Sequence, residues 1–202
     1  MARIAEVRAP AQPNSPQQEA RVRRILRAAA RQGAASGLER VQMHEVAKES
    51  GVAIATLYRY FPSKMHLFTA VMRAQIDRIQ GEVAEPVDDL DPVDAVTALL
   101  LEATRQMLRS PLLAQAMMIS NNAAIHATEA EAGQTTASFT NLLLRTARRE
   151  EPSDRDHQLA RLVEHGWYGL LTSALNQHTA ADQVEEDLRA TCELLLAEWS
   201  TT

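Results

Sequence analysis

The chain has 202 residues, of which 46% are hydrophobic, and a formal net charge of −5. Its single cysteine, Cys192, excludes an intrachain disulfide and fits a reducing compartment. No apolar run approaches the ~20 residues of a membrane span, and the first twenty residues lack the apolar core of a secretion signal, so we expect a cytoplasmic protein without a membrane partner.

The charge is divided unevenly along the chain. Residues 1–64 carry 11 Lys and Arg against 5 Asp and Glu, a balance of +6, whereas residues 65–202 carry 10 against 21, a balance of −11. A basic segment ahead of an acidic one favours contact of one end of the protein with a polyanion such as nucleic acid.

Good helix formers dominate the chain and apolar alternation with period two is absent, so we predict an all-α fold. Residues 1–17, rich in Pro, Gln, Ser and Ala, are expected to form a disordered lead. Residues 18–36 repeat apolar side chains at i, i+3, i+4, i+7 and i+8, which predicts an amphipathic helix with a stop at Gly37.

Two short helices follow, over residues 43–50 and 53–60, with a tight turn at Gly51 and Val52 between them. Leu57 and Phe61 lie one turn apart and are predicted to face the core. The other side chains at the end of this helix are predicted to face solvent: Thr56, Tyr58, Arg59 and Tyr60.

Pro62 ends this helix, and Ser63 is placed to cap a fourth helix over residues 64–81. The stretch EVAEPVDDLDPVD, residues 82–94, then breaks the helical pattern. We therefore predict a helix-turn-helix domain over residues 18–64, joined by the fourth helix to a second domain over residues 82–202. Five more helices are predicted there, over residues 92–109, 111–124, 129–149, 154–177 and 181–199.

Helix, glycine turn and helix make a helix-turn-helix arrangement, whose second helix enters the major groove of DNA. Thr56 can offer its hydroxyl or methyl group to a base edge, and Tyr58 and Tyr60 can donate to phosphate oxygens. Arg59 suits a phosphate or a guanine. Lys64, in the first turn of the next helix, is predicted to clamp a phosphate. Arg21 and Arg24 on the first helix either contact phosphate or are simply solvated.

The segment VQMHEVAKESGVAIATLYRYFPSKMHLF resembles the DNA-binding region of TetR-type transcriptional repressors, and the resemblance spans about residues 18–72. It implies a homodimer that binds an operator in double-stranded DNA. It also implies a larger domain holding an effector pocket, with the last two helices forming a four-helix dimer interface. By position it implies DNA contacts from Gln42, His44, Ala55, Thr56, Tyr58, Tyr60 and Lys64. His44 is either a base contact or an exposed helix residue.

Two positions depart from the family pattern. Gln42 stands where a capping Thr is usual, and Ala53 stands where a Ser is usual, so two hydroxyl groups suited to phosphate are missing.

The second domain offers a set of side chains that either line a pocket or form core, namely Met107, Met117, Met118, Asn121, Asn122, Phe139, Leu143, Trp167 and Tyr168. Asn121 and Asn122 follow an apolar face, where buried amides need partners, and a polar ligand group is one explanation. The dimer interface is expected to include Leu170, Leu171, Ala174, Leu188, Cys192 and Leu195.

Together with SPLLAQAM at residues 110–117, the DNA-binding segment is similar to the actinobacterial KstR-type branch of the family. That branch controls sterol and lipid catabolism and responds to CoA thioesters of sterol-derived acids. The resemblance therefore implies a hydrophobic effector, a steroid- or acyl-CoA thioester. A multidrug-type ligand remains an alternative.

Nothing in the sequence indicates an enzyme. His126, His157, His165 and His178 match no metal-site spacing, and no phosphate loop or nucleophile motif is present, so we expect no catalysis, cofactor or metal. A helical scaffold protein that does not bind DNA is an alternative, but it would leave the basic first segment unexplained.

Overall fold

The computed structural model describes residues 11–82, 90–127 and 129–200, and in them it is all-α, as predicted, without a strand. The described residues form nine α-helices followed by a short 3-10 helix, η1 (Ala197–Trp199). The α-helices are α1 (Pro16–Arg40), α2 (Met43–Ser50), α3 (Ile54–Tyr60), α4 (Lys64–Glu82), α5 (Pro92–Arg109), α6 (Pro111–Ala127), α7 (Glu129–Thr146), α8 (Asp154–Leu175) and α9 (Ala181–Leu195).

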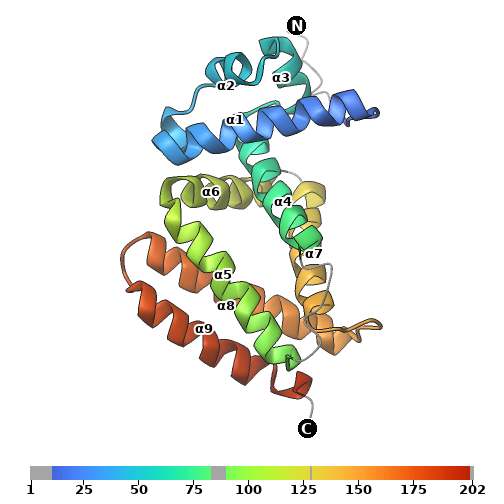
Figure 1. Cartoon of the computed structure of the whole chain (residues 1–202), viewed down its shortest axis with the longest axis vertical. Coiled ribbons are helices and arrows are strands. Elements are labelled where there is room, and N and C mark those ends of the chain that lie inside the picture. Colours follow the sequence, from blue (N-terminus) through green and yellow to red (C-terminus); the bar gives the residue numbers. More distant parts are fainter. Residues whose placement is uncertain (1–10, 83–89, 128, 201–202) are drawn as a thin grey trace, which may run out of the picture.

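The molecule is elongated, with a small helical head at one end and a larger helical body at the other (Figure 1). Helices α1, α2 and α3 form the head, and α5 to α9 form the body. Helix α4 starts in the head and runs down into the body, so it belongs to both parts.

Local capping explains several helix starts. The Asp91 carboxylate accepts from the Val93 N–H at 2.9 Å, and Pro92 occupies the first turn of α5. The Ser63 hydroxyl accepts from the His66 N–H at 3.3 Å, as its predicted capping role requires.

The first helix begins earlier than predicted because Ser15 and Pro16 form the same kind of start that Asp91 and Pro92 form. The expected disordered lead is therefore too long. Its last residues, 16 and 17, are helical, and its first ten lie outside the described residues.

Gly37 interrupts α1, with φ of 74°, but one further turn of helix follows it. The predicted interdomain boundary at 82–94 includes residues 83–89, which also lie outside the described residues.

The core of the head extends into the body. Side chains of α1 to α4 pack around the fully buried Phe68, and Leu113, Ala116 and Met117 of α6 complete the same cluster. Gly33 allows α1 to approach this joint, because a Cβ atom there would lie 2.6 Å from Phe68 Cε1. Head and body are thus joined through α4 and α6.

The body has its own apolar core, built from α5, α7, α8 and α9 with part of α4 and α6. Trp167 is its central side chain. Its ring stacks on Phe139 with 4.9 Å between centroids, and its Nε1–H donates to Thr104 Oγ1 at 2.8 Å.

Candidate DNA-binding surface and effector cavity

The turn between α2 and α3 is set by Gly51, whose φ of 67° lies in the left-handed region. The Val52 N–H donates to Ala47 O at 3.0 Å and closes the turn. Leu57 and Phe61 are buried, as predicted, and fix α3 on the core of the head. The two helices therefore form a helix-turn-helix unit on the outer side of the head (Figure 1).

The outward face of this unit carries polar and aromatic side chains with charges of both signs. On α3, Ala55 and Arg59 are exposed, Thr56 is half-buried and Tyr58 is 47% exposed. On α2, Gln42 and His44 are exposed, and neither α2 nor α3 has a side-chain cap, consistent with the missing Thr and Ser. These positions suit the predicted DNA contacts, which remain predictions.

The prediction that Tyr60 faces solvent is wrong, because its side chain is only 4% exposed. Tyr60 lies three residues after Leu57, so both fall on the same face of α3, which is the face packed against α1 and α4. The Arg59 guanidinium lies over the Tyr60 ring, 5.1 Å from its centroid. Tyr60 is therefore a core residue that positions α3.

Lys64 has a structural role that the sequence did not reveal. Its Nζ donates to Leu38 O at 3.1 Å and to Glu39 O at 3.0 Å, and so holds the last turn of α1. An ammonium group has three N–H donors, so the predicted phosphate contact would use the third.

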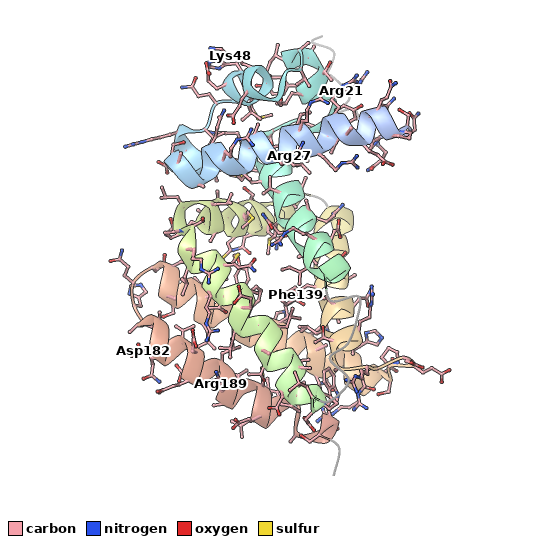
Figure 2. All side chains as sticks on the ribbon, viewed as in Figure 1. Arg21, Arg27, Lys48, Phe139, Asp182 and Arg189 are labelled. Carbon is pink, nitrogen blue, oxygen red and sulfur yellow. The ribbon has the colours of Figure 1, made fainter. Side chains whose placement is uncertain are left out.

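Polar contacts hold α2 against α1. Arg24 Nε donates to Ser50 O at 3.3 Å, and Arg31 Nε lies 2.7 Å from Glu49 Oε1. Hydrogen bonds from Gln32 and Arg31 lower the pKa of the Glu49 carboxyl. Arg21 also lies on α1 and is half-buried. Lys48, which was not among the residues predicted to contact DNA, projects from α2 at the outer end of the head (Figure 2) and is a further candidate for such a contact. Its position inside the helix-turn-helix segment was the available signal.

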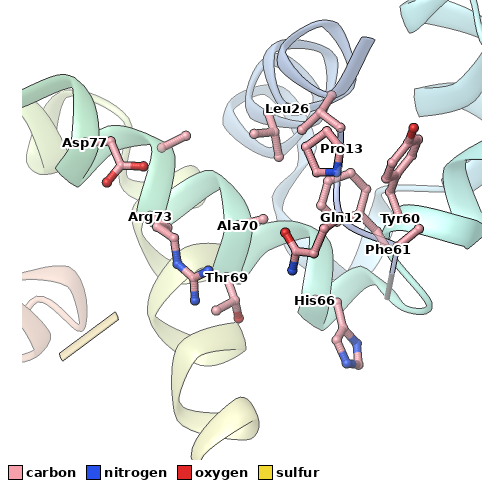
Figure 3. A pocket seen from close by; sticks show the side chains of 13 residues that line it. Gln12, Pro13, Leu26, Tyr60, Phe61, His66, Thr69, Ala70, Arg73 and Asp77 are labelled. Atoms are coloured by element: carbon pink, nitrogen blue, oxygen red, sulfur yellow. The ribbon is translucent and has the colours of Figure 1, made fainter. Parts of the chain in front are cut away.

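The head contains a hollow of about 320 Å³ between α1, α4 and the residues that precede α1 (Figure 3). Tyr60 and Phe61 form one wall, and Thr69 and Arg73 lie along α4 on another. The Ala11 N–H donates to Arg59 O at 3.0 Å. This hydrogen bond attaches the segment before α1 to the end of α3.

The body contains a cavity of about 220 Å³ between α4, α5, α6, α7 and α8, which we call the effector cavity. Four predicted effector residues line it, namely Met107, Met117, Phe139 and Trp167. One wall of the cavity, contributed by α4, was not predicted from the sequence. It consists of Met72, Gln75, Ile76, Arg78 and Ile79. The apolar stripe of α4 is longer than the part that packs in the head. This extra length could have predicted that α4 also packs against the body.

The other predicted effector residues lie elsewhere. Met118, Asn122 and Tyr168 line a separate, more open hollow of about 340 Å³ between α6 and α8. Burial raises the pKa of the Tyr168 hydroxyl, and Asn122, its hydrogen-bond partner, acts in the opposite direction. Leu143 is packed in the body core, and Asn121 is buried with no partner for its Oδ1 atom. Neither Leu143 nor Asn121 lines either of these two spaces, and their assignment as effector residues remains a prediction.

Part of the predicted dimer interface is also wrong. Leu171, Leu188 and Cys192 are buried within the chain, between α8, α9 and α5, and burial raises the pKa of the Cys192 thiol. The apolar stripes that predicted them serve packing inside one subunit, which periodicity alone cannot distinguish from packing between subunits. Leu170, Ala174 and Leu195 are half-buried and remain available to a partner.

Within the part of the chain that the structure describes, no three His, Cys, Asp or Glu side chains are grouped to hold a metal ion. None of the described helices combines the length and the apolar character needed to cross a bilayer.

A helix-turn-helix head joined by a shared helix to a helical body with a cavity is the architecture expected of a DNA-binding regulator. The family model for bacterial regulatory proteins of the tetR family matches residues 25–71, and that for the tetracyclin repressor-like C-terminal domain matches residues 90–195. The chain belongs to the TetR family, a class of transcriptional regulators rather than of enzymes.

Relatives support the same assignment. The chain is 34% identical to the transcriptional repressor KstR of Rhodococcus jostii, over 91% of this chain and 86% of the relative. It is 30% identical to KstR of Mycobacterium tuberculosis, over 90% and 83% of the two chains. The similarity to the KstR-type branch is thus confirmed.

Solved structures agree. A TetR regulator from Rhodococcus sp. RHA1 superposes with a TM-score of 0.83 at 44% identity, covering 89% of this chain and 97% of that one. FadR of Thermus thermophilus, a repressor solved with lauroyl-CoA, superposes with a TM-score of 0.65 at 19% identity, over 87% and 93% of the chains. At that identity the second likeness shows the fold alone.

Proposed function

We propose that the protein is a homodimeric repressor that binds a near-palindromic operator and is released by a hydrophobic effector, a steroid- or acyl-CoA thioester. One observation carries this proposal: α4 forms a wall of the effector cavity and also packs into the core of the head. A change in the cavity that moves α4 must therefore move the head.

The DNA side of the proposal rests on the outward face of α2 and α3. Two such faces, related by a two-fold axis, would enter successive major grooves, with half-sites ~34–36 Å apart. Ala55 and Thr56 offer methyl groups to thymine, while Tyr58, Arg59 and Lys64 are suited to phosphates.

The effector side rests on the size and the chemistry of the cavity. Ligand sites commonly measure about 300–1,000 Å³, whereas this cavity measures about 220 Å³. A sterol-sized body would therefore have to displace the walls, and Met72, Met107 and Met117 are flexible enough to adapt. The effector can shift the equilibrium only by its differential affinity for the two arrangements.

The relatives support this class of effector. One neighbouring fold was solved with lauroyl-CoA, and the sequence is similar to KstR repressors. A multidrug-type ligand would suit the same apolar walls, so the experiment must compare the two classes.

Fluorescence polarisation with the DNA upstream of the protein's own gene, in a salt series, tests the proposal. We expect tight binding that weakens steeply with salt and that a thioester reverses. Release by cationic multidrug compounds instead would replace the effector class and keep the repressor. Binding no stronger than to a random duplex would contradict the repressor itself.

A further inference from the structure

Three polar side chains of the effector cavity are linked by hydrogen bonds where α4 faces α5, which we call the polar end of the cavity. Its walls are otherwise apolar, and the polar lining residues are Gln75 and Arg78 of α4 together with Gln106 and Ser110 at the end of α5. An apolar ligand with one polar group would therefore bind in a single orientation, with that group at this end.

Arg78 connects the two helices across this end of the cavity. Its Nη2 donates to Gln106 Oε1 at 3.1 Å, and its Nε donates to Gln75 Oε1 at 3.3 Å. Gln106 is oriented for this role, because its amide nitrogen donates to Glu102 Oε1 at 3.1 Å. Helix α4 packs closely along α1, α6 and α7 but not along α5. The Arg78–Gln106 hydrogen bond is thus a bridge between two cavity walls that are not otherwise packed closely together.

We propose that Arg78 binds the carbonyl or carboxylate oxygen of the effector and that this oxygen replaces Gln106 Oε1 on the guanidinium. The inference rests on the proposed function, since it assumes that this cavity is the effector site. It adds a requirement to the ligand class: an apolar body with an oxygen acceptor at one end. When the ligand oxygen replaces Gln106 as the acceptor for Arg78, the hydrogen bond between α4 and α5 is broken. Helix α4 can then move, and the head moves with it.

Substitutions of the two bridge residues, Arg78 and Gln106, should change ligand affinity in opposite directions. Loss of Arg78 removes the donor that the ligand needs, so ligand affinity must fall. Loss of the Gln106 side chain removes only the acceptor that competes with the ligand, so ligand affinity must rise. A purely structural bridge would change affinity in the same direction in both variants.

The test is a titration of the full-length protein with lauroyl-CoA and with dodecanoate. Tryptophan fluorescence serves as the signal, because Trp167 lies in the cavity wall. Arg78→Gln should weaken binding about tenfold, and Gln106→Ala should strengthen it about threefold, since hydrogen bonds to charged groups exceed neutral ones. Arg105→Gln is the matched control. It removes an exposed charge next to Gln106 that pairs with Glu185 of α9 and does not line the cavity, and binding should stay within about twofold of wild type.

Circular dichroism of each variant confirms that the helices are retained. Wild-type binding that both substitutions weaken, or that neither changes, would overturn the inference and leave the proposed function standing. A wild-type protein that responds to neither probe would overturn the effector class and the inference together.

Discussion

Two tyrosines of α3 lie two residues apart and have opposite surroundings. Tyr58 is 47% exposed on the outward face, whereas Tyr60 is 4% exposed beneath it. A helix advances 100° per residue, so a shift of two residues turns a side chain from the DNA-facing side to the core. One of these two tyrosines is therefore accessible for the proposed DNA contact, and the other contributes to the stability of the head.

Tyr58→Ala should weaken operator binding about fivefold and change the melting temperature little, because it removes one predicted phosphate contact and a side chain that is about half exposed. Tyr60→Ala should lower the free energy of unfolding by about 3 kcal/mol, because it empties a core site. Polarisation assays and urea unfolding measure the two effects. Operator affinity that is unchanged in Tyr58→Ala would show that α3 meets DNA through other side chains.

At the scale of elements, α4 is a helix that joins the head to the body. Its first half packs on α1 and α6 at the joint around Gly33, and its second half forms one wall of the effector cavity. Head and body are thus not independent units, because α6 contributes to the core of the head.

Gly33→Ala should lower the free energy of unfolding by about 1–3 kcal/mol, because its Cβ would meet the fully buried Phe68 ring at 2.6 Å. Gly81→Ala, later on the same chain, has no neighbour within 4 Å of its Cβ and should raise stability by about 1 kcal/mol. Urea unfolding distinguishes the two. A neutral Gly33→Ala would mean that the joint between α1, α4 and α6 is loose.

The joint between α7 and α8 contains a titrating group. Burial raises the pKa of the Glu164 carboxyl to about 7, against the opposing effect of the Thr140 hydroxyl, which donates to it at 3.2 Å. The folded chain therefore keeps this proton up to about pH 7, while the unfolded chain releases it near its ordinary value of 4.5. The stability that the protonated Glu164 carboxyl contributes to the fold is fully present below pH 4.5 and is lost as the pH rises through 7.

Glu164→Gln keeps an acceptor for Thr140 but cannot titrate. Between pH 5 and pH 8 the stability of the wild type should therefore fall relative to that of the variant, by on the order of 2 kcal/mol. Urea unfolding of both proteins at pH 5, 6.5 and 8 gives the difference. Parallel curves for the two proteins would show that the carboxyl is solvated.

The secondary structure of this chain could largely be predicted from its sequence, because periodicity and capping are local. Asp91 and Pro92 place the start of α5, and Gly51 places the turn before α3. The assignments that failed depend on three-dimensional neighbours. Leu171 and Cys192 pack inside one subunit, and α4 lines a cavity whose other walls come from helices far along the chain. No local pattern specifies which partner an apolar stripe will meet.

At the scale of the whole molecule, the basic and acidic segments lie at opposite ends of the long axis. The segment of +6 ends where α4 begins, and the segment of −11 forms most of α4 and the body (Figures 1 and 2). An acidic body is repelled by DNA while a basic head is attracted, so the long axis should orient before contact. The net charge of −5 conceals this polarity.

The proposed dimer should form on the outer sides of α8 and α9. Gly166 on α8 lies against Thr191 on α9, and the two helices run antiparallel. Leu162 lies about one turn before Gly166, and Leu194 lies about one turn after Thr191. The two leucines are therefore at the same height along the helix pair. Leu162 is 42% and Leu194 80% exposed. Leu162→Glu combined with Leu194→Glu should convert the dimer to monomer in sedimentation velocity, because the change places charges in an apolar interface. Leu112→Glu, an exposed leucine on α6, should leave the dimer intact. An unchanged dimer in the double variant would place the interface elsewhere.

The hydrogen bond between the Ala11 N–H and Arg59 O has a practical consequence for handling the protein. A peptide tag that replaces the residues ahead of Ala11 would start beside α3, the helix that we propose binds DNA, where its bulk would compete with the DNA backbone. A tag that follows η1 would lie at the opposite end of the long axis (Figure 1). Affinities measured with an amino-terminal tag should therefore be weaker than those measured with a carboxy-terminal one, for steric reasons alone.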